Sequence, residues 1–330
     1  MNKKESIKEE TFNKTLKEIN TDFGEGSVMR FSDKQKDNYQ YISTDSIAFN
    51  RAIGGGVVLG KMYEIMGWEG SGKSTVCGHL AKNAQLSFPE RKVVYVDSEN
   101  SLDLEYFQNI GVDIDNLYIV QIENAEQGFT IAQKLINTGE VSLCIIDSDT
   151  AMQPKGLIEG EFGEMKMGLK ARLNGQVYPQ LHKSINNNNT ALIVVSQYRE
   201  KIGVIYGSPT TTSGGHCVKF TADCRLEISK SLAKDGDDIY GTTITVKAIK
   251  NRLAVPFKKA TFEVVFGKGI NIMKDLINVA ISDGVIIKGG AGWLTYNELK
   301  IQGVVNFETL LNDNPELEQE LKEKILTYNK

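Results

Sequence analysis

Cysteine pairs and long apolar runs are missing from this sequence of 330 residues. The cysteines form no CxxC pair and stand in apolar or mixed surroundings, which favours reduced thiols over a disulfide framework or a zinc site; they are Cys77, Cys144, Cys217 and Cys224. No run of 18 apolar residues occurs, and the basic residues at the start have no apolar stretch behind them, which argues against a membrane span and a signal peptide. We therefore expect a cytoplasmic protein with no membrane partner.

The chain also lacks an excess of basic residues. Lys and Arg number 38 against 42 Asp and Glu, so the formal net charge is −4. A global positive field therefore cannot recruit a polyanion, and any nucleic-acid site must be a local patch. The composition, 41% hydrophobic and 24% charged, is typical of a folded globular protein. The length predicts roughly two domains.

The pattern of polar and apolar residues changes along the chain. It predicts an α/β fold and divides the chain into three regions. Residues 1–38 combine an amphipathic helix, with Phe12, Leu16 and Ile19 on one narrow stripe, and a polar linker. In the expected core, 39–269, apolar strand-like runs alternate with helix-length segments, which is typical of βαβ units around a mostly parallel sheet. Stricter alternation after about residue 225 predicts antiparallel strands that extend this sheet. Residues 270–330 predict a small C-terminal α+β domain.

The strongest motif is GWEGSGKST, residues 67–75. It fits GxxxxGK[ST] and lies between an apolar strand and a helix, as a phosphate-binding loop requires. Its backbone N–H groups can surround a phosphate at the positive end of the helix dipole, and the alternative is a glycine-rich turn without a ligand. We expect Lys73 to reach the β- and γ-phosphates of ATP and the Ser74 hydroxyl to ligate Mg²⁺. The predicted ATP-binding residues of this loop are Gly67, Glu69, Gly70, Ser71, Gly72, Lys73, Ser74 and Thr75.

Two further strand-like runs end in acidic residues. The run LCIID ends at Asp147, and VVYVDSEN contains Asp97 and Glu99. Because parallel strands present their carboxyl ends at the ligand-binding edge of such a sheet, we expect Asp147 to hold magnesium-bound water and Glu99 to orient the attacking water. The alternatives are a turn or N-cap role for Asp147, and a purely structural role for the two acids of the other run.

Several segments, in a fixed order, resemble the RecA-type homologous recombinases of bacteria and phages. The similarity runs from about residue 26 to 275, with a weaker continuation to the end. Its most specific stretches are YVDSENSLDLEY, GVDIDNL, PKGLIEGEFGEMKMGLKAR, REKIGVIYGSPTTTSGGHCVKF and IKNRLAVPFK. The resemblance implies a RecA-type P-loop ATPase core with a mostly parallel central sheet, an N-terminal helical arm and a small C-terminal α+β domain.

The resemblance also implies roles around the nucleotide. Glu99 matches the hydrolytic base, and Asp103 and Tyr106 match the positions that hold the adenine. A carboxylate can accept from the exocyclic amine, and an aromatic ring can stack on the base; from the sequence alone, Tyr106 reads as a core aromatic on a helix face. Gln197 ends the strand ALIVVSQ and resembles the family's γ-phosphate sensor, whose two positions could order or release the loop that follows.

Two glycine-rich segments, 159–172 and 201–215, resemble the family's DNA-binding loops. Glycine backbone and hydroxyl groups can follow phosphates without reading bases, and the alternative is a solvated surface loop. The residues expected to contact DNA are the cations Arg172, Arg199 and Lys201, the apolar wedges Met167 and Ile202, and Thr211, Ser213, Gly214 and Gly215.

Three residues resemble contacts between neighbouring protomers. Lys250 and Arg252 match a cationic pair that reaches the neighbour's ATP, where they would neutralise charge that develops on the γ-phosphate. Phe220 matches an aromatic that packs into the adjacent protomer. Head-to-tail contacts of this kind generate a helical filament when they do not close. For Lys250 and Arg252 the alternative is a solvent-exposed pair on a strand edge, with no role between protomers.

Four positions depart from the family pattern. His216 stands where an amide side chain is usual, Thr210 replaces an acid, and Arg252 stands where lysine is usual. Pro179 stands where a basic residue is common, and we expect it to interrupt the helix after the first DNA segment.

The sequence therefore predicts an ATP- and Mg²⁺-dependent, DNA-stimulated ATPase. We expect it to form filaments on single-stranded DNA and to promote homologous pairing and strand exchange with duplex DNA in recombination and repair. Two alternatives stay open, a ring-type DNA helicase on the same core and a nucleotide-gated filament scaffold whose turnover is incidental.

Overall fold

The computed structural model describes residues 3–24, 27–28, 30, 39–160, 168–200, 210–212 and 216–327. The chain divides into two compact units, Met1–Tyr39 and Gln40–Lys330. The first contains helix α1 (Lys3–Phe23), as expected from the amphipathic stripe. On it Leu16 and Ile19 are half-buried, whereas Phe12 is 63% exposed.

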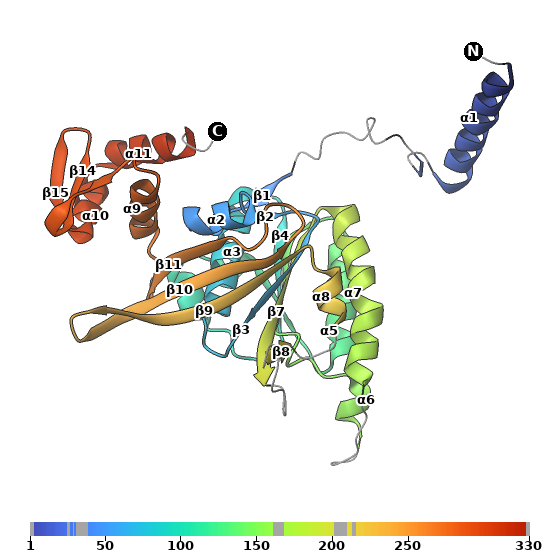
Figure 1. Ribbon diagram of the computed structural model, residues 1–330. Helices are drawn as coiled ribbons and strands as arrows, with labels where there is room; N and C mark the ends of the chain where they lie inside the picture. Colours follow the sequence, from blue (N-terminus) through green and yellow to red (C-terminus); the bar gives the residue numbers. More distant parts are fainter. Residues whose placement is uncertain are drawn as a thin grey trace. The chain divides into compact units, whose positions relative to one another are not determined.

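A mixed sheet of ten strands dominates the second unit (Figure 1). Its order is β12-β11-β10-β9-β3-β7-β6-β4-β5, and β8 pairs with β7 outside this path. Strands β9, β3, β7, β6, β4 and β5 run parallel, whereas β10, β11 and β12 extend the sheet in antiparallel fashion. The strands are β3 (Met62–Gly67), β4 (Lys92–Asp97), β5 (Leu117–Gln121), β6 (Val141–Asp147), β7 (Ala191–Glu200), β8 (Thr210–Thr212), β9 (Cys224–Asp235), β10 (Asp238–Asn251), β11 (Lys259–Val265) and β12 (Gly269–Ile270). The predicted α/β architecture is therefore confirmed.

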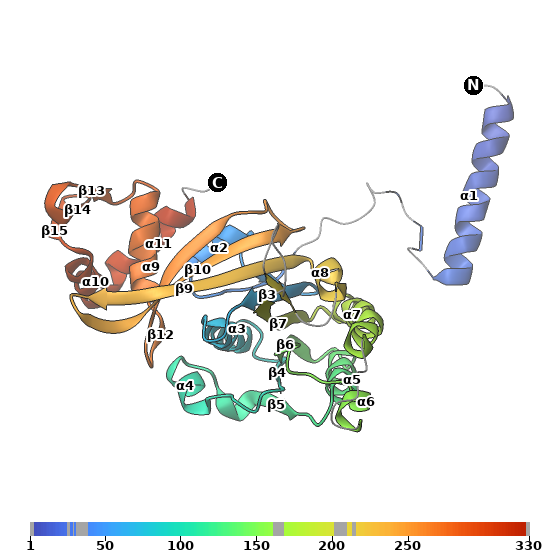
Figure 2. The ribbon, with the colours of Figure 1, turned by 60° about the horizontal axis from the view of Figure 1, so that its bottom comes forward.

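Helices cover both faces of the parallel strands (Figure 2). On one face, α3 (Lys73–Ser87) and α4 (Leu104–Asn109) bury Leu80 and Phe107. On the other, α5 (Ala125–Ile136) and α7 (Leu169–Asn188) bury Phe129 and Leu181. Because both faces are covered, the strands read as continuous apolar runs.

The strand register brings the predicted active-site segments to one edge of the sheet. Asp97 at the end of β4 lies opposite Asp147 at the end of β6. Gly67 at the end of β3 lies opposite Gln197 on β7. Residues far apart in the sequence therefore meet at the carboxyl ends of the parallel strands, where α/β sheets bind ligands.

The expectation that Pro179 interrupts a helix is wrong. Helix α7 runs from Leu169 to Asn188 with Pro179 inside it. A proline ring clashes with the carbonyl four residues earlier, and that residue here is the exposed Gly175. The neighbours Tyr178 and Leu181 are fully buried, so packing on the sheet holds the helix on both sides of the proline.

The C-terminal part has a separate apolar core, built around Leu276, Phe307 and Leu311. It contacts the start of helix α2 (Ile47–Ile53) through Asp275, which accepts hydrogen bonds from the Ser46 hydroxyl and the Ile47 N–H. Its elements are α9 (Ile272–Ser282), β13 (Ile287–Lys288), η3 (Gly290–Gly292), β14 (Trp293–Tyr296), β15 (Leu299–Gln302), α10 (Val304–Asp313) and α11 (Pro315–Thr327). The other short elements are β1 (Tyr41–Ile42), α2 (Ile47–Ile53), β2 (Val57–Val58), η2 (Ile114–Asn116), α6 (Lys155–Ile158) and α8 (Cys217–Thr221).

Candidate active site

The loop between β3 and α3 contains glycines that no other residue could replace without rearrangement. Gly72 has a φ of 94°, and a Cβ there would lie 2.4 Å from Cδ1 of Ile244. A Cβ on Gly67 would lie 2.6 Å from the carbonyl oxygen of Ile228. Beside them, the buried Ser71 Oγ has no hydrogen-bond partner among the described residues. A tight turn with an unsatisfied polar atom fits a loop that takes a polar ligand.

Lys73 is the first residue of α3, and its ammonium folds back over this loop. Its Nζ donates to the carbonyl oxygens of Trp68 at 2.8 Å and Gly67 at 3.3 Å. Burial lowers the pKa of Lys73, while the charges of Asp147 and Glu99 oppose this shift. The predicted phosphate-binding lysine therefore bonds the loop itself and lies near Glu99, the predicted base, and Asp147, the predicted magnesium residue.

Asp147 and Ser74 meet at the end of the loop. The Ser74 hydroxyl donates to Asp147 Oδ2 at 2.9 Å, and the Tyr95 hydroxyl donates to the same oxygen at 2.6 Å. Burial raises the pKa of Asp147, and these two hydrogen bonds oppose it. A hydroxyl and a carboxylate are oxygen ligands of the kind Mg²⁺ prefers. The described residues form no group of three or more His, Cys, Asp or Glu that could hold a metal.

Sequence reasoning missed Tyr95. Its side chain lies two residues before Asp97 on β4, and the register pairs it with Ile145, two residues before Asp147. This diagonal places the hydroxyl beside the carboxylate. Only the pairing of β4 with β6 reveals the contact.

Glu99 receives two hydrogen bonds at the same oxygen. Gln197 Nε2 donates to its Oε1 at 2.8 Å, and the Ser148 hydroxyl donates to it at 2.6 Å. The structure thus brings the predicted base and the predicted γ-phosphate sensor into direct contact. Asp97 has a different role, because its carboxylate accepts from the N–H groups of Glu99 at 3.2 Å and Leu102 at 3.2 Å and so closes the turn after β4.

The predicted adenine-binding residues lie close to the loop. Asp103 caps α4 by accepting from the Tyr106 N–H at 2.9 Å. The Tyr106 hydroxyl donates to Thr75 Oγ1 at 3.3 Å, and its ring packs half-buried against the core. Tyr106 therefore packs against the edge of the core and also contacts the last residue of the phosphate-binding motif.

Three of the predicted DNA contacts fall on described residues. Arg172 is exposed near the start of α7. Arg199 is exposed on β7 and pairs in the antiparallel β7–β8 ladder with Thr211, which is also exposed. The other predicted contacts lie outside the described residues; they are Met167, Lys201, Ile202, Ser213, Gly214 and Gly215.

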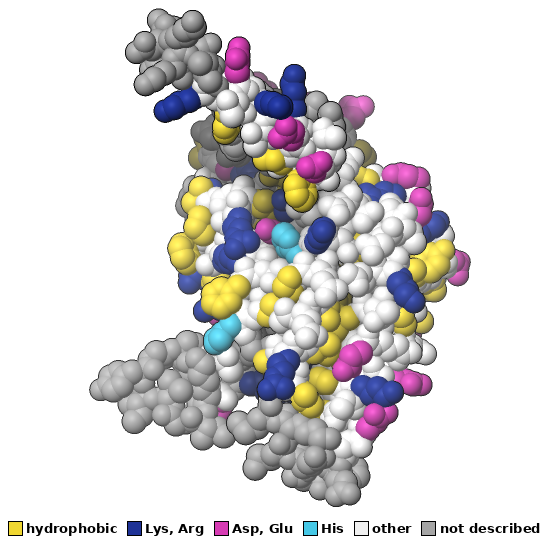
Figure 3. All heavy atoms as spheres, turned by 90° about the vertical axis from the view of Figure 1, so that its right-hand side faces the viewer, with side chains coloured by type: hydrophobic (Ala, Val, Ile, Leu, Met, Phe, Trp, Pro, Cys, Tyr) yellow, Lys and Arg dark blue, Asp and Glu magenta, His cyan; other side chains and the backbone are white. Residues whose placement is uncertain are grey.

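The three predicted protomer contacts gather around the end of α8. Lys250 Nζ donates to the carbonyl oxygens of Lys219 and Phe220, each at 3.0 Å, and Arg252 Nη2 donates to that of Phe220 at 3.2 Å. The Phe220 ring is 66% exposed. On the face that carries α7 and α8, hydrophobic side chains lie beside Lys, Arg and His (Figure 3). We call Phe220, Lys250 and Arg252 the α8 patch.

Three of the four family departures lie near the predicted DNA or protomer contacts. His216 is exposed immediately before α8, and its ring lies 6.1 Å from that of Phe220, measured between centroids. Arg252 also pairs with Asp223, with 3.7 Å between Nη1 and Oδ1. Thr210 lies opposite Glu200 in the β7–β8 ladder.

A glycine-rich loop before a helix, with strand-end acids beside it on a mostly parallel sheet, defines the site of a P-loop ATPase. No helix in the described part of the chain is long and apolar enough to cross a membrane.

Comparison with known proteins gives the family. Residues 10–271 match the family model of the RecA N-terminal domain, and residues 274–329 match that of the RecA C-terminal domain. Protein RecA of Streptomyces ambofaciens is 41% identical over 321 residues, covering 96% of this chain and 86% of that protein. Protein RecA of Bacteroides thetaiotaomicron is 40% identical over 311 residues, covering 93% of each chain. The chain belongs to the RecA family and is a DNA-dependent ATPase of recombination and repair. The predicted family is confirmed.

Proposed function

We propose that this recombinase binds ATP with Mg²⁺ between successive protomers of a filament on single-stranded DNA. The observation that carries the proposal is the meeting of Glu99 and Gln197, 2.8 Å apart, beside the phosphate-binding loop. Glu99 is the proposed base, and Gln197 lies on the strand that leads into the second DNA segment. A hydrogen bond between them can therefore make the rate of hydrolysis depend on DNA binding. The proposed product of this coupling is homologous pairing and strand exchange with a duplex.

Each loop residue has a chemical task in this proposal. Lys73 exchanges its two carbonyl partners for the β- and γ-phosphates, and the N–H groups of residues 67–75 surround the phosphate oxygens. Ser74 and Asp147 hold Mg²⁺, which neutralises phosphate charge when bound. Asp103 and Tyr106 position the adenine.

Glu99 and Gln197 carry the chemistry and its control. The Glu99 carboxylate accepts a proton from the attacking water and so acts as general base. The Gln197 amide donates either to Glu99 or to the γ-phosphate. Because Gln197 lies on β7, a change between these two partners can change the position of Arg199 and of the segment 201–215 that follows. Lys250 and Arg252 stabilise the charge that develops on the neighbour's γ-phosphate.

We also propose three functional regions and a place of action. Residues 1–38 are an oligomerisation arm, 39–269 the ATPase core with its DNA segments, and 270–330 a small C-terminal domain. A separate unit at the start of the chain and a separate apolar core after Gly269 support this division. The four cysteines are free thiols, which supports action in the reducing cytoplasm.

The test is ATP hydrolysis with and without single-stranded DNA, together with filament imaging and strand exchange between homologous and unrelated DNA. We expect DNA-stimulated hydrolysis, filaments with ATP but not with ADP, and exchange only with homologous DNA. Directional unwinding that ignores homology would instead identify a helicase. Filaments that form with ATP but promote no strand exchange, even between homologous DNA molecules, would identify a nucleotide-gated scaffold.

A further inference from the structure

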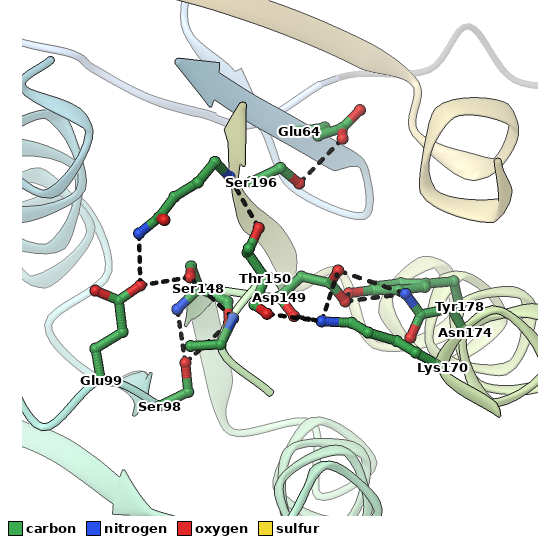
Figure 4. A network of polar contacts seen from close by, with 12 residues as sticks. Glu64, Ser98, Glu99, Ser148, Asp149, Thr150, Lys170, Asn174, Tyr178 and Ser196 are labelled. Carbon is green, nitrogen blue, oxygen red and sulfur yellow. Dashed lines mark hydrogen bonds and ion pairs between the residues drawn. The ribbon is translucent and has the colours of Figure 1, made fainter. Parts of the chain in front are cut away.

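A buried polar network lies between α7 and the turn that follows β6 (Figure 4). Asp149 in that turn is 0% exposed. Its Oδ1 accepts from the Tyr178 hydroxyl at 2.6 Å and from Asn174 Nδ2 at 3.2 Å. Lys170 Nζ lies 3.8 Å from Asp149 Oδ2, and it donates to the carbonyl oxygens of Asp149 and of Thr150, the latter at 3.0 Å. One turn of chain is thus held by three residues of a single helix.

The same turn is bonded to the catalytic residues on its other side. The Gln197 N–H donates to Thr150 Oγ1 at 2.9 Å, while the Gln197 side chain donates to Glu99. Ser148, which also donates to Glu99, directly precedes Asp149. Hydrogen bonds on both sides of the turn 148–150 therefore connect Lys170 on α7, through the chain of this turn, to Glu99 in the active site.

Apolar side chains pack against Tyr178 of this network. The Phe129 ring meets the Tyr178 ring edge-on, and Leu181 and Val194 are buried in the same cluster. A buried ion pair is costly to desolvate, and apolar residues of similar size often give equal stability. Stability alone therefore gives little reason for a lysine and an aspartate here, whereas fixing one arrangement of α7 against β6 and β7 does.

Two predicted DNA contacts lie on the elements that carry the network. Arg172 lies in the first turn of α7, two residues after Lys170, and Arg199 lies on β7, two residues after Gln197. Burial lowers the pKa of Lys170, Asp149 opposes this shift, and the charge of Arg199 adds to it, so Arg199 is close enough to act on the same ammonium. A phosphate bound at Arg199 would offset part of that positive charge and so change the electrostatic field at Lys170.

We propose that Asp149 and Lys170 are positioning residues that transmit DNA contact at the start of α7 to Gln197 and Glu99. The inference rests on the proposed function in one respect, that DNA binds at Arg172 and Arg199. It adds a route from the first DNA segment to the active site, besides the direct route along β7.

The experiment compares Lys170→Met with Lys183→Met, an exposed lysine farther along the same helix. The readout is kcat at saturating single-stranded DNA divided by kcat without DNA. We expect this ratio to fall about tenfold in Lys170→Met, within the range of coupling energies for such networks, with KM for ATP unchanged. Lys183→Met should keep the ratio of the unchanged protein.

A second variant keeps the test valid if the unpaired Asp149 destabilises the fold. Asp149→Asn with Lys170→Met removes both charges and leaves an acceptor for Tyr178 and Asn174. We expect a thermal midpoint close to that of the unchanged protein and a ratio that stays low. A ratio restored in this double variant overturns the inference, because it would assign the pair a purely structural role.

Other outcomes distinguish a failure of the Asp149–Lys170 route from a failure of the proposed function. Weaker DNA binding by Lys170→Met with an unchanged ratio at saturating DNA would make Lys170 a direct DNA contact and also overturn the inference. If the unchanged protein shows no stimulation by DNA, the proposed function itself fails. If that protein is stimulated and the variants are stimulated equally, only the route through Asp149 and Lys170 is lost.

Discussion

At the scale of single residues, Glu99 shows how the surroundings of one carboxylate set its chemical task. One of its oxygens is occupied by Ser148 and Gln197. Asp97, only two residues earlier, instead accepts backbone N–H groups and closes a turn. Two acids in one short motif therefore have separate roles, one structural and one proposed to be catalytic.

We expect Glu99→Gln to lower kcat for ATP hydrolysis by about 10²–10⁴-fold, the usual contribution of a general base. ATP-dependent binding to single-stranded DNA should remain, since the amide removes no phosphate ligand. Steady-state hydrolysis and fluorescence anisotropy measure the two effects. Glu105→Gln, an exposed acid on α4, is the matched control. Turnover at the unchanged rate in Glu99→Gln would remove this residue from the mechanism.

Tyr95 provides a second prediction at this scale. Its hydroxyl bonds the Asp147 carboxylate at 2.6 Å, and removing a hydrogen bond to a charged group costs about 1.5–3 kcal/mol. In Tyr95→Phe the pKa of Asp147, already raised by burial, should rise further. We expect the Mg²⁺ concentration for half-maximal hydrolysis to increase about tenfold or more. The exposed Tyr118→Phe is the control, and an unchanged Mg²⁺ requirement would show that Tyr95 only packs.

At the scale of elements, helix α3 is anchored to strand β12 through a histidine. His79 donates through Nδ1 to Asp45 Oδ2 at 2.5 Å, and its Nε2 accepts from the Ile270 N–H at 2.9 Å. Because Nε2 accepts, Nδ1 carries the proton. Lys82 also pairs with Asp45, at 2.5 Å. The helix that begins at the phosphate-binding loop is therefore fixed to the segment that leads into the C-terminal part.

This anchor predicts that the free energy of unfolding depends on pH. Burial acts to raise the pKa of Asp45, but hydrogen bonds from His79, Lys82 and Asn83 outweigh it and lower the pKa below 3.8. The stabilisation is therefore complete above the unfolded pKa and is lost as the pH falls through the lower folded value. We expect Asp45→Asn to lower the free energy of unfolding by about 1–3 kcal/mol at pH 7.

Urea unfolding across pH tests this prediction. The difference between Asp45→Asn and the unchanged protein should shrink once the pH falls below 3.8. Asp115→Asn, an exposed acid, should show no such trend. A difference that stays constant through the acid range would mean that Asp45 contributes through packing rather than charge.

At the scale of the whole molecule, the proposed ATP site is divided between protomers. The described contacts of Lys250 and Arg252 join α8 and Asp223 within the chain, not residues 67–75. The exposed Phe220 ring beside them gives the α8 patch an apolar centre with a cationic border, a combination that suits a protein interface. A neighbour's nucleotide can therefore meet these cations only through assembly.

We expect Glu99→Gln and Lys250→Met to be inactive separately and to restore hydrolysis when mixed. In a random 1:1 filament, about a quarter of the interfaces pair the intact Glu99 of one protomer with the intact Lys250 of the next, because each interface is head-to-tail. DNA-stimulated hydrolysis should therefore recover to about a quarter of the unchanged rate. Mixing each variant with itself is the control. No recovery, in protein that forms filaments, would place both residues in one protomer's site.

The sequence predicted the features that local chemistry dictates. The GxxxxGK[ST] spacing located the phosphate-binding loop, and the apolar runs that alternate with helical segments predicted the parallel sheet. The family resemblance added Gln197, Asp103 and Tyr106. The prediction for Pro179 was wrong because a local rule was applied where burial of Tyr178 and Leu181 overrides it.

The contacts between residues distant in the sequence depend on strand register and burial, and the sequence did not predict them. Nothing near Tyr95 in the sequence marks it as a partner of Asp147, and nothing near Lys170 marks it as a partner of Asp149. Both contacts exist because neighbouring strands and the covering helix bring distant residues within hydrogen-bond or ion-pair distance. The sequence by itself determined which chemical groups the protein has and the local turns that present them. Only the tertiary structure decided which of these groups form hydrogen bonds or ion pairs with one another, because such contacts depend on distances in space that the order of residues in the chain does not contain.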